Sequence, residues 1–422
     1  MKVTLINTSD AGGGAPVACL RLLKALESKH VDAVMQVQEK KTTELGVKGT
    51  NNYFFGRVKI NFDFLVERLP FIWFNAKEKP LRFAFSTANI GTDISELPDI
   101  VNADILHLHW TNGAYLSINN LKKLFQTGKP IVWTLHDMWA FTGGCHYAGE
   151  CDHFERECGN CWMLRHSGDN DLSFEGWIRK SDMYKYTKNI VFVTCSHWLA
   201  DVARSSSLLK GFRIETIPNP IDTEIFSPGN KEALRLKWGI DPRSKVILFG
   251  AANILDRRKG INYLVEALGD LKRNYSDGEN IEIVIFGKNK SFNVSQLPFK
   301  VYELNTISSQ NDIAGLYSLA DVFVSPAVED NLPNTIMESL ACGTPVVAFN
   351  TGGIPDMVAH KRNGYLAEFK SAADFAAGIN YILNSEEKHE LSLNARRKVL
   401  STFTNDIVAA KYIAVYQSIL NK

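Results

Sequence analysis

Short apolar runs of strand length alternate along this chain with stretches whose apolar residues recur every three or four positions. The first run is Lys2–Asn7, and Val17, Leu20, Leu23 and Leu26 then lie on one face of the helix expected after it. Such alternation is typical of parallel strands covered by helices. The pattern therefore predicts an α/β fold.

The alternation continues along the chain with one interruption. Further strands are expected at Val31–Val37, Ala103–Trp110, Pro130–Asp137, Asn189–Ser196, Lys245–Ala252, Glu282–Gly287, Val301–Leu304, Asp321–Pro326 and Pro345–Asn350. The interruption is Arg213–Pro228, a proline-rich stretch that we interpret as a linker. We expect two doubly wound domains, residues 1–212 and 213–400, with a ligand cleft between them, and a helix in 401–422 that crosses back to the first domain.

Composition and charge exclude some functions. The 422 residues include 47 basic and 46 acidic ones, so no net positive field favours nucleic acid. The opening MKVTLINTSDAGGGAP has no apolar signal-peptide core, and no run of residues is long and apolar enough to span a membrane. We expect a soluble, cytoplasmic protein.

Residues 52–75 combine many aromatic side chains with basic ones. The aromatic residues are Tyr53, Phe54, Phe55, Phe62, Phe64, Phe71, Trp73 and Phe74. One interpretation is a helical hairpin packed within the first domain, which we favour because aromatic side chains mostly serve cores. The other is a surface that docks a lipid-linked acceptor or the inner face of the membrane.

Asp330–Gly353 carries the most chemical information. A strand ends before it at Pro326, and a helix is expected to begin near Pro333 and to end at Gly343, since proline favours the first helical turn and glycine follows the last. Free N–H groups at the start of such a helix suit a diphosphate. Glu338, one turn into the helix, can accept hydrogen bonds from a ribose diol.

Two glycine-rich loops precede expected helices in a similar way. Thr351–Asp356 follows a strand, and Asp10–Pro16 contains Gly12, Gly13 and Gly14. Glycine lets the backbone approach a ligand closely, and each following helix would offer its N-terminus to an anion.

Together these motifs resemble the retaining GT-B glycosyltransferases of family 4, which carry Glu-x7-Glu, a small-residue helix and a Gly-Gly-x-Pro loop. The resemblance covers nearly the whole chain and includes Gly12–Gly14, Trp133–Asp137, Ile217–Phe226, Arg258–Gly260 and Asp330–Gly353. The block Trp139–Cys161 resembles a subgroup found in bacterial capsule and exopolysaccharide synthesis. The resemblance implies two Rossmann-like domains, and transfer of a sugar from a nucleoside-diphosphate sugar to a glycan or lipid-linked acceptor.

The resemblance also implies roles for single residues. The donor site would consist of Gly12, Gly13, Gly14, Arg258, Lys259, Asp330, Asn331, Leu332, Asn334 and Glu338. In it Arg258 and Lys259 would bind the diphosphate, Asp330 would act on the sugar and Glu338 would hold the ribose. His136 would be the catalytic residue of the first domain, with Asp137 to orient it, and His107 and His109 are weaker candidates on the acceptor side.

The sequence departs from the family pattern in three places. Asp330 replaces the first Glu of the acidic pair, which changes how the sugar hydroxyls are gripped but not the reaction class. Ala251-Ala252-Asn253 stands where Gly-Arg is usual, and Arg258 would supply the missing charge. The linker has Asn219-Pro220 where Asn-Gly is commoner.

Family membership implies retention of the anomeric configuration. No second carboxylate can be assigned as a nucleophile, so we favour front-face attack, in which the departing phosphate takes the acceptor proton. No Asp-x-Asp stands in the loops where metal-dependent transferases carry theirs, and we expect catalysis without a metal cofactor.

Four of the seven cysteines lie close together in the sequence, at Cys145, Cys151, Cys158 and Cys161. Four sulfurs suit tetrahedral zinc, and the final Cys-x2-Cys is a chelating pair. The alternative is four reduced thiols, because a reducing compartment disfavours disulfides. The loop follows His136, so we expect it to shape the acceptor pocket.

Other functions also fit doubly wound domains. A dinucleotide oxidoreductase would need Gly-x-Gly-x-x-Gly, and Gly12–Val17 lacks the third glycine. A sugar-nucleotide epimerase of GT-B fold would release altered nucleotide sugar without an acceptor. A non-catalytic nucleotide-sugar-binding protein would never release nucleoside diphosphate.

Overall fold

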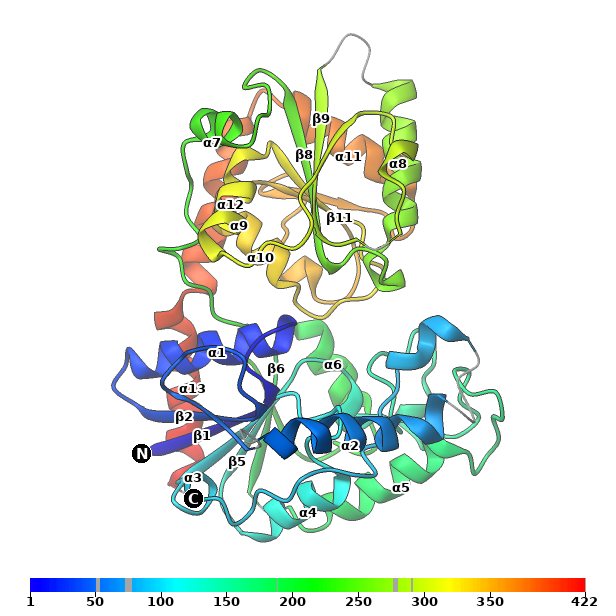
Figure 1. Cartoon of the computed structure of the whole chain (residues 1–422), viewed down its shortest axis with the longest axis vertical. Coiled ribbons are helices and arrows are strands. Elements are labelled where there is room, and N and C mark those ends of the chain that lie inside the picture. Colours follow the sequence, from blue (N-terminus) through cyan, green and yellow to red (C-terminus); the bar gives the residue numbers. More distant parts are fainter. Residues whose placement is uncertain (51–53, 73–77, 188, 276–279, 290, 422) are drawn as a thin grey trace. The chain divides into compact units, whose positions relative to one another are not determined.

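The computed structural model describes residues 1–50, 54–72, 78–187, 189–275, 280–289 and 291–421. The chain divides into two compact units, unit 1 with Met1–Asn219 and Val408–Lys422, and unit 2 with Pro220–Ile407 (Figure 1). Each unit is built on one parallel sheet, as the apolar pattern predicts. The C-terminal segment of unit 1 contains most of one helix, α13 (Asn405–Leu420).

The sheet of unit 1 has the strand order β3-β2-β1-β4-β5-β6-β7. Its strands are β1 (Lys2–Ser9), β2 (Asp32–Glu39), β3 (Val47–Gly49), β4 (Ile105–Leu108), β5 (Ile131–Leu135), β6 (Ile190–Thr194) and β7 (Arg213–Thr216). The interpretation of Arg213–Pro228 as a linker is wrong at its start, because Arg213–Thr216 pairs with β6. The chain therefore passes into unit 2 at Asn219, after the expected boundary at 212.

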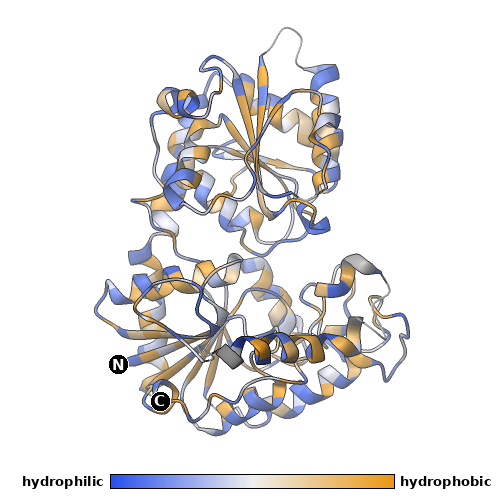
Figure 2. Cartoon of the chain, viewed as in Figure 1, coloured by the Kyte–Doolittle hydropathy of each residue, from blue (hydrophilic) through white to orange (hydrophobic). Residues whose placement is uncertain are grey.

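Helices cover both faces of this sheet. α1 (Gly14–Glu27) and α13 pack on one face, and α4 (Ile118–Gln126), α5 (Leu172–Tyr184) and α6 (His197–Ser205) pack on the other. Side chains alternate along each strand: in β5, Val132 joins the α1 side, whereas Ile131 and Trp133 join the α4 side. Figure 2 shows the resulting strands as mostly hydrophobic.

Unit 2 repeats this arrangement with the strand order β10-β9-β8-β11-β12-β13. Its strands are β8 (Lys245–Asn253), β9 (Ile281–Lys288), β10 (Lys300–Glu303), β11 (Val322–Ser325), β12 (Val346–Phe349) and β13 (Gly364–Ala367). α8 (Ile261–Asn274) and α11 (Ala372–Asn384) cover one face. α9 (Gln310–Leu319) and α10 (Asn334–Ala341) contact the strands from the other side, where α12 (Lys388–Thr402) and α7 (Lys231–Lys237) pack against them.

The aromatic segment forms one helix, α2 (Phe54–Ile72), in place of the expected hairpin; Tyr53, Trp73 and Phe74 lie outside the described residues. Buried Phe71 stacks on Phe85, and buried Arg68 donates to the Phe85 carbonyl at 2.9 Å. The opposite side of the helix leaves several apolar side chains exposed, namely Val58, Phe62, Leu65 and Leu69. No helix within the described ranges is long and apolar enough to cross a membrane.

Candidate functional site

The polar centre of unit 2 is an ion pair between two loops. Lys259, from the loop after β8, donates to Oδ2 of Asp330 at 2.6 Å, and both side chains are mostly buried. The loops touch through their backbones: the Val328 N–H donates to the Arg258 carbonyl at 2.8 Å. Gly260 has φ +69°, and a Cβ there would lie 1.9 Å from the Pro326 carbonyl, so only glycine fits this approach. The structure thus brings Lys259 and Asp330 together as one unit.

Arg258 points elsewhere in this site. Its Nη2 donates to Oδ2 of Asp256 at 2.7 Å, and the Asp256 carboxylate also caps the short helix Arg257–Lys259. Burial raises the pKa of Asp256, but the charge of Arg258, its hydrogen bonds and the charge of Lys259 together outweigh burial and lower it. Arg258 is therefore compensated by a carboxylate of its own loop, which distinguishes it from its neighbour Lys259.

α10 begins one residue after its expected start and ends at Ala341, and Gly343 with φ +75° follows it. Pro333 caps the helix without a side-chain hydrogen bond. Asn331 and Leu332, just before the helix, are buried. The start of α10 thus follows Asp330 closely in the chain.

Glu338 is buried on α10 and accepts a hydrogen bond from the Tyr317 hydroxyl at 3.1 Å. Tyr317 lies on α9, and its ring packs edge-on against Phe323 of β11. This partner was not predicted, because it lies on a different helix and no spacing rule links the two residues. A carboxylate has several acceptor positions, so it can accept hydrogen bonds from a ligand diol as well as from a tyrosine hydroxyl.

The loop after β12 packs against the backbone of Asp330. Gly352 has φ +55°, and a Cβ there would lie 2.0 Å from the Asp330 carbonyl. The Gly353 N–H donates to that carbonyl at 3.2 Å. The helix expected at Pro355 is only a 3-10 turn, Ile354–Asp356, so this loop supports Asp330 and does not offer a second helix N-terminus.

In unit 1, His136 directly follows β5 and pairs with His109, which follows β4. Nε2 of His136 lies 3.0 Å from Nδ1 of His109, and the rings are stacked. Burial lowers the pKa of His136 to about 4, although the charge of Asp137 acts in the opposite direction. His136 is therefore a neutral hydrogen-bonding group at physiological pH, suited to contact a hydroxyl.

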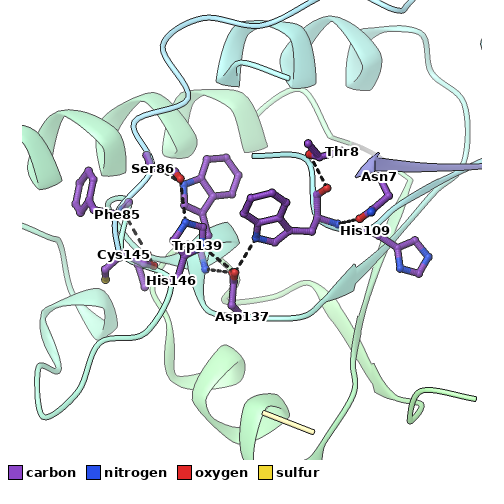
Figure 3. Close-up of polar contacts among 12 residues, drawn as sticks. Asn7, Thr8, Phe85, Ser86, His109, Asp137, Trp139, Cys145 and His146 are labelled. Carbon is purple, nitrogen blue, oxygen red and sulfur yellow. Dashed lines mark hydrogen bonds and ion pairs between the residues drawn. The ribbon is translucent and has the colours of Figure 1, made fainter. Parts of the chain in front are cut away.

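Asp137, which we expected to orient His136, joins three loop segments (Figure 3). Its carboxylate accepts hydrogen bonds from Trp110 Nε1 at 3.0 Å, from the Trp139 N–H at 2.9 Å and from His146 Nδ1 at 2.7 Å. Burial raises the pKa of Asp137, and His146 with these hydrogen bonds outweighs burial and lowers it. The ionised carboxylate thus fixes the loop after β4 to the loop after β5.

The loop after β4 is also fixed to β1. Asn7 Oδ1 accepts from the Trp110 N–H at 2.9 Å, and the Thr8 hydroxyl donates to the Asn112 carbonyl at 2.7 Å. Figure 3 shows Asn7 and Thr8 beside this loop. The backbone around residues 109–112 is therefore held by β1 on one side and by Asp137, which follows β5, on the other.

Three buried polar atoms in this loop lack a hydrogen-bond partner within the described residues: His109 Nε2, Thr111 Oγ1 and Asn112 Nδ2. His109 and Asn112 line a cavity of about 10 Å³ together with His136 and Asp137. That volume suits one water-sized group such as a hydroxyl. Unpaired buried polar atoms carry a free-energy cost that a polar ligand would remove. Asn112 and Thr111 were missed from sequence, where they are two more polar residues after a strand.

His107 is structural and does not belong to this pocket. It lies within β4, fully buried, with Nδ1 2.7 Å from the Tyr416 hydroxyl of α13 and Nε2 2.8 Å from the Thr134 hydroxyl. Its candidacy on the acceptor side was wrong, because the alternation of strand β4 turns it toward α13.

Gly12, Gly13 and Gly14 lead into α1. Gly12 has φ +91°, a Cβ added there would meet open space, and Gly13 caps α1 without a side-chain hydrogen bond. Asp10, at the start of the loop, accepts hydrogen bonds from the backbone N–H groups of Lys41 and Thr42.

The four cysteines of the segment Cys145–Cys161, hereafter the cysteine loop, all line a second cavity of about 20 Å³. They are free thiols. As the side chains stand, no three Cys, His, Asp or Glu residues among those described could hold a metal ion. The loop is attached to the polar centre of unit 1, since Cys145 is followed by His146, whose ring also contacts the Ser86 hydroxyl at 2.9 Å.

Two family models match the chain. The model described as Glycosyltransferase Family 4 matches residues 12–225, more than half of the chain, and the model described as Glycosyl transferases group 1 matches residues 230–398. The first match covers most of unit 1 and ends just inside unit 2, and the second lies within unit 2.

Curated relatives are similar at moderate identity. D-inositol 3-phosphate glycosyltransferase of Pseudarthrobacter chlorophenolicus is 28% identical over 284 residues, which cover 65% of this chain and 60% of that protein. N-acetyl-alpha-D-glucosaminyl L-malate synthase of Bacillus anthracis is 21% identical over 337 residues, 78% of this chain and 79% of that protein. The chain thus spans less than two thirds of the length of the first of these relatives.

Solved structures agree on the fold. Alr3699/HepE of Anabaena, in complex with UDP and glucose, aligns with a TM-score of 0.64 at 15% identity and covers 99% of this chain and 100% of that one. The similarity confirms the predicted GT-B architecture of two Rossmann-like α/β domains.

Proposed function

Because the chain belongs to glycosyltransferase family 4, we propose that it transfers a sugar from a nucleoside-diphosphate sugar to an acceptor hydroxyl with retention of the anomeric configuration. The acceptor is a glycan or a lipid-linked glycan of surface polysaccharide synthesis. The proposal assigns the donor to unit 2 and the acceptor to unit 1.

The observation that carries the proposal is the Lys259–Asp330 pair at the start of α10. A diphosphate leaving group needs a positioned cation and backbone N–H groups, and here both occur within one packed pair of loops. When the donor binds, Lys259 would exchange part of its contact with Asp330 for the phosphate oxygens. Asp330 would then be available to the sugar hydroxyls, and buried Glu338 to the ribose.

A nucleoside diphosphate is also the ligand of a structural relative. Alr3699/HepE was solved with UDP and glucose. We propose the same class of donor for this chain, with the base and the sugar left to be measured.

Neutral hydrogen-bonding groups dominate the proposed acceptor pocket of unit 1. His136 is uncharged above about pH 4, its pKa in the folded chain, because it is buried. Unpaired Asn112 Nδ2 and Thr111 Oγ1 can bond to hydroxyl oxygens without any charge. This chemistry fits a sugar or another polyol as the acceptor and disfavours a highly charged group.

Retention is proposed to follow front-face attack. The bond from the anomeric carbon to the phosphate oxygen breaks, the acceptor oxygen bonds to the same face, and the departing phosphate oxygen takes the hydroxyl proton. Asp137 is a poor nucleophile because Trp110, Trp139 and His146 already occupy its oxygens. A covalent sugar–enzyme adduct trapped with a fluorinated donor would overturn this mechanism.

The exposed stripe on α2 supports a lipid-linked acceptor. Val58, Phe62 and Leu65 are each about 60% exposed and lie on one face at helical spacing. Nearby Arg57 is also exposed. We propose that this face rests on the cytoplasmic surface of a membrane, where a lipid-linked glycan would be presented.

The proposed function is tested by incubating the purified protein with UDP-, GDP- and ADP-sugars, with and without extracted glycolipids. We expect nucleoside diphosphate release that depends on acceptor, and a product whose anomeric proton signals show retention. Release of an altered nucleotide sugar without acceptor would favour an epimerase. Binding of a donor without any product would favour a non-catalytic binding protein.

A further inference from the structure

The cysteine loop is compact although it has almost no regular structure. Between β5 and α5 the described residues form only the 3-10 turns Trp139–Phe141 and His153–Glu155 and an isolated bridge from Cys145 to Phe85. Small irregular segments of this kind are commonly held together by disulfides or by a metal ion. The four cysteines are unpaired thiols, so no disulfide does this here.

The four cysteines line one space. Cys145, Cys151, Cys158 and Cys161 all line the cavity of about 20 Å³, and Cys145 interacts electrostatically with each of the other three. The backbone is packed tightly around them: a Cβ at Gly143 would lie 2.9 Å from the Cys158 Cβ and 2.1 Å from the Ser173 carbonyl. All four cysteines therefore lie around one small space, although their sulfurs are not arranged as metal ligands in the present structure.

Hydrogen-bond donors face these sulfurs. The Gly143 N–H donates to Cys158 Sγ at 3.1 Å, and the Met163 N–H donates to Cys161. Backbone N–H groups directed at sulfur stabilise a thiolate more than a thiol. Burial is the larger effect and raises the pKa of Cys158 to about 11 and that of Cys161 to about 12, so these hydrogen bonds offset only part of the cost of a thiolate.

A buried lysine lies beside the cluster. Lys180 of α5 is fully buried, and its ammonium group donates to the carbonyls of Trp139 and Thr142, both neutral partners. It interacts electrostatically with Cys145 and Cys158. Burial lowers the pKa of Lys180 to about 7, because a buried ammonium group is costly unless an anion is near. A metal bound by four thiolates carries a net charge of about −2 and would favour the charged form of Lys180.

We propose that the cysteine loop binds one Zn²⁺ ion through Cys145, Cys151, Cys158 and Cys161. The four thiols would release their protons to solvent as four Zn–S bonds form. In the present arrangement no three of the described side chains could hold a metal, so binding must draw the sulfurs together. Neutral thiols do not attract one another, so the four sulfurs lie further apart without a metal than they would around one.

The metal would act on the site through His146. The Gly144 carbonyl accepts a hydrogen bond from the Ser86 N–H at 2.8 Å. Cys145, the next residue, is a proposed zinc ligand, and His146 after it is the hydrogen-bond partner of Asp137. Zinc would therefore hold the loop that fixes Asp137, without touching donor or acceptor. The proposal does not depend on the proposed glycosyl transfer and is tested without any substrate.

The first test is the metal content of the full chain, purified without chelator from zinc-supplemented cells. We expect about one zinc per chain in the wild type and in Cys19→Ala, whose thiol lies in the core far from the loop in sequence, and less than about a tenth of that in Cys158→Ser/Cys161→Ser. A wild-type protein without zinc would overturn the proposal.

The double variant could lose zinc by unfolding, so the wild-type protein is also loaded with Co²⁺ after chelation. We expect sulfur-to-cobalt charge-transfer absorption with the intense visible bands of tetrahedral Co²⁺, and four thiols that react with a disulfide reagent only after the metal is removed. Cobalt spectra without sulfur ligation, or a disulfide within the cysteine loop found by mass spectrometry, would contradict the zinc site.

Discussion

The two units build their polar centres in opposite ways. In unit 2 an ion pair, Lys259–Asp330, joins two loops whose backbones touch at Gly260 and Gly352. In unit 1 neutral histidines and one carboxylate, Asp137, are buried in a network that joins three segments. The charges of unit 2 are paired across two loops, whereas the one carboxylate of unit 1 is held by three hydrogen-bond donors. This difference suits a diphosphate in one unit and a hydroxyl in the other.

The largest effect is expected when the lysine of the unit 2 ion pair is removed. Lys259→Ala should lower kcat/KM for transfer by about 100-fold, the range lost with one electrostatic contact to a developing anion. Arg258→Ala should cost less than about 5-fold, because Asp256 already compensates Arg258. Steady-state kinetics with varied donor measure both. Equal losses in the two variants would remove the distinction between the neighbouring cations.

The next largest effect is expected when the proposed contact of Glu338 with the ribose is removed. Glu338→Ala should raise the KM for the donor at least tenfold, consistent with the loss of hydrogen bonds to a charged group. Tyr317→Phe removes the hydroxyl that Glu338 accepts from but keeps the carboxylate, and should change that KM by less than about threefold. If Tyr317→Phe is as damaging as Glu338→Ala, the carboxylate serves the fold and not the ribose.

The next largest effect is expected on the pH dependence of stability, because unit 1 contains buried histidines of lowered pKa. Burial lowers the pKa of His107 to about 3 and that of His136 to about 4. The unfolded chain binds these protons below about pH 6.5 and the folded chain does not, so unit 1 should lose stability as the pH falls from 6.5 to 4.

The slope for fully buried His107 is about 1.4 kcal/mol per pH unit in that window. Denaturant unfolding followed at several pH values measures it, and His107→Gln should flatten the slope. Unchanged stability of the wild-type chain between pH 6.5 and 4.5 would contradict neutral buried histidines.

The smallest effect on catalysis is expected from the apolar face of α2. Phe62→Ser/Leu65→Ser should weaken binding to anionic lipid vesicles severalfold while transfer to a water-soluble acceptor stays within about twofold. Vesicle co-sedimentation and the soluble assay make the comparison, with Leu236→Ser as an exposed control in unit 2. Equal sedimentation of variant and wild type would remove the membrane contact.

The fold was largely predictable because the central strands are continuous apolar runs. The strands that escaped prediction are short and lie toward the edges of the sheets: β3, β7 and β13. β7 reads Arg-Ile-Glu-Thr, which is partly exposed on every residue and too polar to stand out beside its prolines. Edge strands bury less apolar surface and so leave a weaker pattern.

The two sites differed in predictability for a related reason. Unit 2 draws Asp330, the start of α10 and Glu338 from one continuous motif, which a linear pattern can reveal. The network of unit 1 joins residues from Asn7 to His146, and Thr111 and Asn112 become notable only once their polar atoms prove buried and unpaired. Contacts between distant segments have no spacing signature.

The division of labour between the units is tested most directly by calorimetric titration of the full chain with UDP, GDP and ADP. We predict that Lys259→Ala weakens binding of the preferred nucleoside diphosphate at least tenfold, whereas Asn112→Ala leaves it within about twofold. Unchanged binding by Lys259→Ala, or binding lost in Asn112→Ala, would contradict a diphosphate site in unit 2.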